Sequence, residues 1–246
     1  MAKRYEEDGD GGWSLEPEPG PGTALQTITP TVSVDHQLDR VDGRLVMLTE
    51  PGSQQAAAYR VLRHRLTHAR DPRVILITSP GRREGKTVCA ANLALALAEG
   101  RANRVMLVEI NGQAPSLAEL FRIESPLCFF EQLDAYRRNP KLPWVVVEVH
   151  GTGLHVAAIA PENRGARLID WPVFHHALRQ FRNGFDRIVI DAPSVLDNAE
   201  VNLVQDGVDG VVLTAAAGRT RMRDIRRALK QLQPAPVLGV SVIEVA

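Results

Sequence analysis

A glycine-containing loop between an apolar strand and an Ala- and Leu-rich helix most constrains how this 246-residue chain folds. The apolar run VILIT (residues 74–78) leads into SPGRREGKT, and ANLALALAEG follows almost at once. This order predicts a strand, a tight loop and a helix. The first N–H groups of a helix have no partner within it, and the helix dipole favours negative charge there. We therefore predict a phosphate-binding loop.

Each residue at the end of this loop has a role that its chemistry explains. Gly85 lets the backbone approach a phosphate closely, Lys86 places an ammonium against the terminal phosphates, and Thr87 offers a hydroxyl to Mg²⁺. The loop departs from the pattern G-x-x-x-x-G-K-[ST], because Pro80 stands where Gly or Ala is usual and Gly81 comes one place late. The alternative is a Gly-Lys-Thr that only caps a helix. The predicted nucleotide-binding set is Gly81, Arg82, Arg83, Glu84, Gly85, Lys86, Thr87 and Val88.

A second candidate, Asp191, ends the apolar run RIVID. Ala192 and Pro193 follow and end the strand at its carboxyl end, where open α/β sheets place their ligands. P-loop proteins hold Mg²⁺ with the Ser or Thr of the loop and an acid at the end of a buried strand. We therefore predict Thr87 and Asp191 as magnesium ligands; the alternative is an aspartate that caps a turn.

Further apolar runs alternate with segments of helical spacing. The runs cover residues 105–110, 155–160, 187–191, 211–215 and 237–245, and the helical patterns cover 53–69, 174–181 and 222–232. In the first helical pattern the predicted apolar face consists of Ala58, Tyr59, Leu62, Leu66 and Ala69. Uninterrupted apolar strands are covered on both faces, and strand–helix repeats favour parallel crossovers. We predict an α/β fold: a three-layer, parallel, doubly wound P-loop NTPase sheet with helices on both faces. The run VVVEV (145–149) is predicted as an edge strand or hairpin arm.

The first 50 residues differ in composition from the rest. They contain six acidic residues before position 20 and the run PEPGPG, a composition too polar to offset the entropy of ordering. We predict a disordered N-terminal arm at 1–50 and one ATP-binding domain at 51–246.

Charge and cysteine content exclude several classes of protein. Lys plus Arg and Asp plus Glu both total 29, so no overall basic field attracts nucleic acid. A local basic region near 219–230 is predicted as a solvated face. The two cysteines lack metal-type spacing and no apolar segment approaches 20 residues, which favours a cytoplasmic protein without disulfides.

From about residue 50 onward the chain resembles the bacterial tyrosine kinases (BY-kinases) of capsular and exopolysaccharide synthesis. The resemblance is carried, in this order, by AAAYRVLRHRL, SPGRREGKT, VMLVEINGQAPSL, FDRIVIDAPSVL and VDGVVLTAAAGRTRMRDIRRAL. It implies a parallel P-loop sheet and ATP with Mg²⁺ as phosphoryl donor. It also implies a separate membrane-bound polysaccharide co-polymerase or export protein as partner, and hence recruitment to the inner face of the membrane.

Carried over residue by residue, the resemblance makes Gly85, Lys86 and Thr87 the end of the Walker A motif and Asp191 the Walker B acid. The family's second acidic motif, Asp-x-Asp-x-Arg, aligns with residues 109–113, where all three key positions differ: they are Glu109, Asn111 and Gln113. Only Glu109 keeps a carboxylate. The implied catalytic set is Lys86, Asp191 and Glu109.

Family members usually form rings through a Glu-x-x-Arg-x-x-Arg helix. Here Arg60 and Arg63 match the arginines, while Ala57 stands at the acidic position. We predict a homo-oligomer through this helix, with an exposed basic face as the alternative. The family's C-terminal tyrosine cluster is absent, since the sequence stops at Ala246 directly after its last strand.

Three functions remain open at the level of sequence. The first is a cytoplasmic, ATP-dependent protein-tyrosine kinase or kinase-like protein of exopolysaccharide or capsule biosynthesis or export. The second is a non-catalytic scaffold of the export machinery that nucleotide switches, which the changed Asn111 and Gln113 favour. The third is a ParA/MinD-type positioning ATPase, although Gly81 occupies the place of the signature lysine of those proteins.

Overall fold

The computed structural model describes residues 5–8, 12–15, 29–34, 41–101, 103–123, 127–165, 169–198 and 201–244. Its strands are β1 (Tyr5–Asp8), β2 (Gly12–Leu15), β3 (Thr29–Val34), β4 (Val74–Thr78), β5 (Val105–Glu109), β6 (Val145–Val149), β7 (Leu154–Ala157), β8 (Arg187–Asp191), β9 (Gly210–Ala216) and β10 (Val237–Ile243). Its α-helices are α1 (Val46–Thr49), α2 (Gln54–Ala69), α3 (Lys86–Ala98), α4 (Leu117–Leu120), α5 (Phe129–Arg138), α6 (Trp171–Gly184), α7 (Val201–Val204) and α8 (Met222–Gln231). Short 3₁₀ turns cover 99–101, 161–163 and 205–207.

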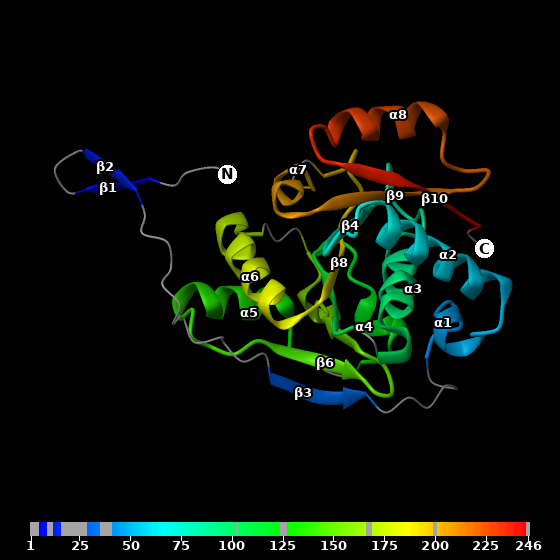
Figure 1. Cartoon of the computed structure of the whole chain (residues 1–246), viewed down its shortest axis with the longest axis horizontal. Helices are drawn as coiled ribbons and strands as arrows, with labels where there is room; N and C mark the ends of the chain where they lie inside the picture. Colours follow the sequence, from blue (N-terminus) through cyan, green and yellow to red (C-terminus); the bar gives the residue numbers. More distant parts are fainter. Residues whose placement is uncertain are drawn as a thin grey trace.

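Eight strands form the main sheet, in the order β10-β9-β4-β8-β5-β7-β6-β3 (Figure 1). Every pairing in this sheet is parallel except that of β6 with β7, which is antiparallel. Strands β1 and β2 pair only with each other. The predicted α/β fold is confirmed, with the correction that the sheet is mostly rather than wholly parallel.

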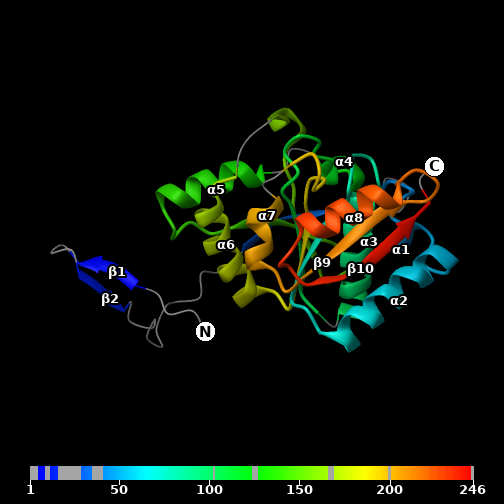
Figure 2. The same ribbon diagram turned by 90° about the horizontal axis from the view of Figure 1, so that it is seen from above.

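Helices cover both faces of the sheet (Figures 1 and 2). Alternate residues of the central strand β4 enter two separate cores. Val74 and Leu76 pack with residues of α5, α6, α7 and α8, whereas Ile75 and Ile77 pack with residues of α1, α2, α3 and α4. All four side chains are at most 1% exposed. A strand buried on both faces needs apolar residues throughout, which explains the uninterrupted run VILIT.

Part of the predicted arm contacts the domain. Leu45 is fully buried and Met47 is 7% exposed, both in the core that contains α3. Asn92 of α3 joins this segment to the domain, because its Oδ1 accepts the Met47 N–H at 3.1 Å and its Nδ2 donates to the Arg44 carbonyl at 2.8 Å. Strand β3 also pairs with β6, so VVVEV is a hairpin arm and not the edge of the sheet. The boundary at residue 50 stays a prediction, but packed structure begins before it.

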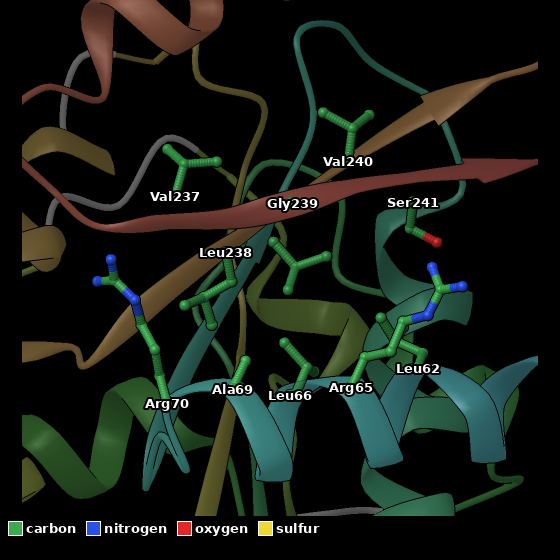
Figure 3. A pocket seen from close by; sticks show the side chains of 11 residues that line it. Leu62, Arg65, Leu66, Ala69, Arg70, Val237, Leu238, Gly239, Val240 and Ser241 are labelled. Atoms are coloured by element: carbon green, nitrogen blue, oxygen red, sulfur yellow. The ribbon is translucent and has the colours of Figure 1, made fainter.

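A groove of about 380 Å³ lies between α2 and β10 (Figure 3). Leu62, Leu66 and Leu238 line it, with Arg65 and Arg70 on either side. Among the residues that the structure describes, its lining contains no carboxylate and no residue of the phosphate loop. It therefore lacks the groups that would hold a metal–nucleotide complex.

The two arginines of α2 are paired within the chain. Arg60 Nη2 lies 2.6 Å from Glu99 Oε1, and Arg63 Nη1 lies 2.9 Å from Glu99 Oε2. Arg63 Nη1 also donates to the Ala96 carbonyl at 2.6 Å. Arg60 and Arg63 of α2 thus both have an acidic partner, Glu99, within their own chain.

We expect Glu99→Gln to lower the free energy of unfolding by about 0.5–1 kcal/mol, because ion pairs of this exposure are weak. Urea titration measures the loss, and Glu162→Gln, at an exposed glutamate, is the control. Arg60→Ala should then have a smaller effect in the Glu99→Gln background than in the wild type. Equal effects in both backgrounds would show that Arg60 does not act through Glu99.

Candidate nucleotide-binding site

The loop between β4 and α3 ends in a glycine that the backbone requires. Gly85 caps α3 in the left-handed conformation, with φ 75° and ψ 10°. A Cβ at this position would lie 3.1 Å from the Ile243 side chain. Both the backbone conformation and the close approach of β10 therefore exclude larger residues. Lys86 follows as the first helical residue and is 7% exposed.

Asp191 lies next to this loop, at the end of β8. The neighbouring strand β4 pairs Ile77 with Asp191, so both strands reach the same edge of the sheet. The Asp191 carboxylate is fully buried, and neither oxygen makes a hydrogen bond of good geometry, although the Thr87 hydroxyl and the Lys86 ammonium lie near it. Burial raises the pKa of Asp191 to about 6, while the charge of Lys86 and the hydroxyl of Thr87 oppose the rise. The structure thus brings Lys86, Thr87 and Asp191 together, as the sequence predicts.

This group of residues fits a magnesium ion. Mg²⁺ prefers oxygen ligands, and it usually binds through one or two carboxylates and completes its shell with water and substrate phosphates. Asp191 offers two buried oxygens without partners, and Thr87 offers a hydroxyl beside them. Among the described residues no cluster of three or more His, Cys, Asp or Glu could hold a metal by itself.

Glu109 is buried beside Asp191 but has backbone partners. Strands β5 and β8 pair Glu109 directly with Asp191. Glu109 Oε1 accepts the N–H groups of Ser116 (2.6 Å) and Leu117 (3.0 Å), and Oε2 accepts the Ile159 N–H (2.9 Å). Burial and the charge of Asp191 raise the pKa of Glu109 to about 8, against the effect of these three donors. The carboxylate joins the start of α4 to the segment that follows β7; a catalytic role stays a prediction.

The other two altered positions also have local partners. Asn111, 5% exposed, donates from Nδ2 to the Ala114 carbonyl at 3.2 Å. Gln113 Oε1 accepts a hydrogen bond from Arg82 Nη2 at 3.0 Å, and Arg82 Nε lies 3.6 Å from Asp197 Oδ2. The segment after β5 therefore contacts the phosphate loop through the exposed Arg82. The sequence did not point to Asp197.

Glu84 is the carboxylate of the phosphate loop, and its side chain is bound within the protein. Its Oε2 accepts the Gly81 N–H at 2.7 Å, and its Oε1 accepts the Thr220 hydroxyl at 2.7 Å. Ser79 Oγ donates to the Gly81 carbonyl at 2.6 Å. Glu84 therefore shapes the loop instead of projecting freely from it. Thr220 lies 136 residues away in sequence, and no motif indicated its part in the site.

Comparison with known proteins finds tyrosine-protein kinases. No family model matches the chain. The chain is 24% identical over 196 residues to the tyrosine-protein kinase YwqD of Bacillus subtilis, covering 78% of this chain and 81% of YwqD. It is 25% identical over 167 residues to the tyrosine-protein kinase CpsD of Streptococcus agalactiae, covering 67% of this chain and 71% of CpsD. Against the putative tyrosine-protein kinase EpsB of Ralstonia solanacearum identity is 27% over 166 residues, covering 67% of this chain and only 22% of EpsB.

Solved structures show the same fold. The chimerical protein CapA2B2 gives a TM-score of 0.71 at 18% identity, with 89% of this chain and 96% of that chain covered. The kinase domain of the Escherichia coli tyrosine kinase ETK gives 0.66 at 16% identity, with 89% and 91% covered. A chain of the MinC:MinD cell division protein complex of Aquifex aeolicus is more distant, with a TM-score of 0.53 at 19% identity, with 70% of this chain and 67% of that chain covered. The fold is that of bacterial tyrosine kinase domains and, more distantly, of ParA/MinD-like P-loop ATPases.

Proposed function

We propose that this chain binds MgATP at residues 81–88 and acts as a tyrosine-kinase-like protein in exopolysaccharide or capsule biosynthesis or export. The observation that carries the proposal is the buried Asp191 carboxylate, whose oxygens lack hydrogen-bond partners beside Lys86 and Thr87. A buried charge without partners is unfavourable unless a ligand completes its surroundings. A magnesium–nucleotide complex supplies that ligand.

Different residues of the chain would bind the phosphates and the metal at this site. The Lys86 ammonium places a positive charge against the terminal phosphates, and the N–H groups at the start of α3 donate to phosphate oxygens. Thr87 and Asp191 would hold the metal, which when bound neutralises charge on those oxygens. Glu109, fixed by three backbone N–H groups, keeps a second carboxylate beside Asp191.

A second candidate function is a nucleotide-switched scaffold without phosphoryl transfer. The specific observation in its favour is that both oxygens of Glu109 are engaged by backbone N–H groups. A general base must be within reach of the proton that it accepts, and Asn111 has no basic group. The third candidate, a positioning ATPase, rests on the more distant similarity to a MinD protein and to a ParA family ATPase.

The proposal extends to location and partners. Among the described residues no helix is long and apolar enough to cross a membrane. We propose a cytoplasmic protein that a separate membrane-bound co-polymerase or export protein recruits to the inner face of the membrane. Association of copies through the α2 helix also belongs to the proposal, although Arg60 and Arg63 already bind Glu99 of their own chain.

One assay distinguishes the three functions. The purified chain is titrated with ATP by calorimetry, with Mg²⁺ and then with EDTA, and is afterwards incubated with labelled MgATP and a tyrosine-containing polymer. We expect Mg-dependent binding and phosphotyrosine by mass spectrometry. Binding without turnover would identify the scaffold, and hydrolysis without phosphotyrosine would identify the positioning ATPase. Failure to bind ATP would reject all three.

A further inference from the structure

The Glu84 carboxylate bridges the phosphate loop and the turn that joins β9 to α8. It is 7% exposed, and each of its oxygens has one partner, the Gly81 N–H in the loop and the Thr220 hydroxyl in the turn. Hydrogen bonds to a charged group are roughly twice as strong as bonds between neutral groups. The bridge is therefore a specific connection between two segments that are remote in sequence.

The turn is held as a unit with Thr220 at its centre. The Thr220 hydroxyl accepts the Ala216 N–H at 2.8 Å, and the Thr220 N–H donates to the Ala216 carbonyl at 2.9 Å. Arg219 adds a second link to the loop, since its Nη1 donates to the Arg83 carbonyl at 3.3 Å. Helix α8 begins at Met222, directly after the turn. A displacement of Thr220 would therefore reach the start of α8.

The far side of this connection is an exposed basic surface. Helix α8 and the turn before it carry the exposed cations Arg219, Arg221, Arg223, Arg226, Arg227 and Lys230. Asp224 is the acidic residue among them, and it pairs with Arg223 at 3.5 Å and with Arg227 at 4.0 Å. The turn thus lies between the phosphate loop and the most basic of the described helices.

The bridge competes with an anion in the loop. Glu84 is the sole acidic residue between positions 79 and 88, and it occupies the Gly81 N–H of a loop that phosphates are expected to enter. Phosphate charge repels a carboxylate at close range, and the repulsion is strong where solvent is excluded. A phosphate that takes over the Gly81 N–H would displace the Glu84 carboxylate from its present position, in which the same carboxylate accepts the Thr220 hydroxyl.

We propose that Glu84 is a positioning residue that couples nucleotide binding in the phosphate loop to the β9–α8 turn, with binding weakening the Glu84–Thr220 bond. This inference rests on the proposed binding of MgATP. Coupling of this kind is reciprocal, so removing the bond strengthens nucleotide binding. The conformation of the turn and of the N-terminus of α8 then depends on whether nucleotide is bound in the phosphate loop.

The test uses the full chain, with MgAMP-PNP as the probe and two readouts, affinity by calorimetry and amide hydrogen exchange at residues 216–224. Thr220→Val removes the hydroxyl, Glu84→Gln removes the charge, Thr220→Ser keeps the hydroxyl, and Thr67→Val is a remote control on α2. We expect Thr220→Val and Glu84→Gln each to tighten binding about fivefold. Their combination should gain little more. Thr220→Ser and Thr67→Val should bind like the wild type.

In hydrogen exchange, the nucleotide should speed exchange of the Ala216 and Thr220 amides about fivefold in the wild type and in Thr220→Ser. The nucleotide should have little effect on the exchange of these amides in Thr220→Val, where the Glu84–Thr220 bond is already missing. Unchanged or weaker binding in Thr220→Val, or a turn that does not respond while nucleotide binds, would overturn the coupling alone. Absence of binding in the wild type would overturn the proposed function as well.

Discussion

Lys86→Ala is expected to weaken MgATP binding about a hundredfold, because charge-assisted hydrogen bonds to phosphate contribute about 1.5–3 kcal/mol each. Lys86 is the first residue of α3 and is 7% exposed, so its ammonium acts where water screens little. Titration calorimetry with and without Mg²⁺ measures the loss. The affinity should fall without a comparable change in thermal stability.

Lys141→Ala is the matched control, since Lys141 is an exposed lysine outside the loop. It should leave ATP affinity unchanged. Circular dichroism and thermal melting show whether Lys86→Ala still folds; Lys86→Met keeps most of the apolar stem if the alanine variant does not. ATP affinity in folded Lys86→Met equal to that of the wild type would show that this lysine does not contact phosphate.

Much of the fold could be predicted because a strand that is buried on both faces consists of uninterrupted apolar residues. Strands β4 and β8 have the predicted bounds, and each lies between two other strands of the sheet. Strand β3 was missed for two reasons. It pairs with a neighbouring strand on one side only, and it lies in the polar N-terminal segment, which also contains the run PEPGPG. Its pairing with β6 is a long-range contact that local composition does not encode.

Helix α2 shows a smaller error with a different cause. Ala58 and Ala69 match an apolar spacing with Leu66, but in the structure both alanines are exposed, and Ala56 is buried instead. Alanine is too small to define a helix face by itself, because it is common on both sides. The larger Tyr59 and Leu62 do pack against the core, as predicted.

The candidate site also contains features that could be predicted from the sequence and features that could not. Lys86, Thr87 and Asp191 could be brought together from sequence, because parallel strands end at one edge and a helix begins there. The hydrogen bonds of Glu109 could not be predicted, since Ile159 lies 50 residues further on. The bond between Glu84 and Thr220 spans 136 residues. Partners this far apart in sequence can be identified only from the three-dimensional structure.

Asp191→Asn is expected to stabilise the nucleotide-free protein at pH 7 by about 2 kcal/mol and to abolish the contribution of Mg²⁺ to ATP binding. Burial raises the pKa of Asp191 to about 6, whereas an unfolded aspartate ionises near 3.9. Above pH 6 the folded protein therefore keeps a charge that the unfolded chain carries more easily. Asparagine removes this charge. It also replaces one of the two carboxylate oxygens that could bind Mg²⁺ by an amide nitrogen.

The pH dependence has a definite sign. The unfavourable effect of the Asp191 charge is fully present above pH 6 and disappears below about pH 4, where both states are protonated. The stability gained by Asp191→Asn should therefore shrink as pH falls from 7 to 4. Denaturant titrations at several pH values, without nucleotide, measure it.

Asp209→Asn provides a control of opposite sign. Asp209 accepts the backbone N–H groups of Arg73 (2.9 Å) and Val74 (2.8 Å), and its Oδ1 lies 2.8 Å from Arg182 Nη2. Burial raises the pKa of Asp209, but these partners lower it more, so the charged form stabilises the fold. Asp209→Asn should therefore destabilise the protein at pH 7, since a carboxylate with partners is lost.

The opposite responses of these two aspartates separate a ligand site from a structural one. A carboxylate kept in place for packing alone is expected to have partners, as Asp209 does, and its replacement lowers stability. A carboxylate kept for a ligand remains unsatisfied until the ligand binds, and its replacement raises the stability of the free protein. If Asp191→Asn lowers stability as Asp209→Asn does, or binds MgATP as tightly as the wild type, Asp191 is not a metal ligand.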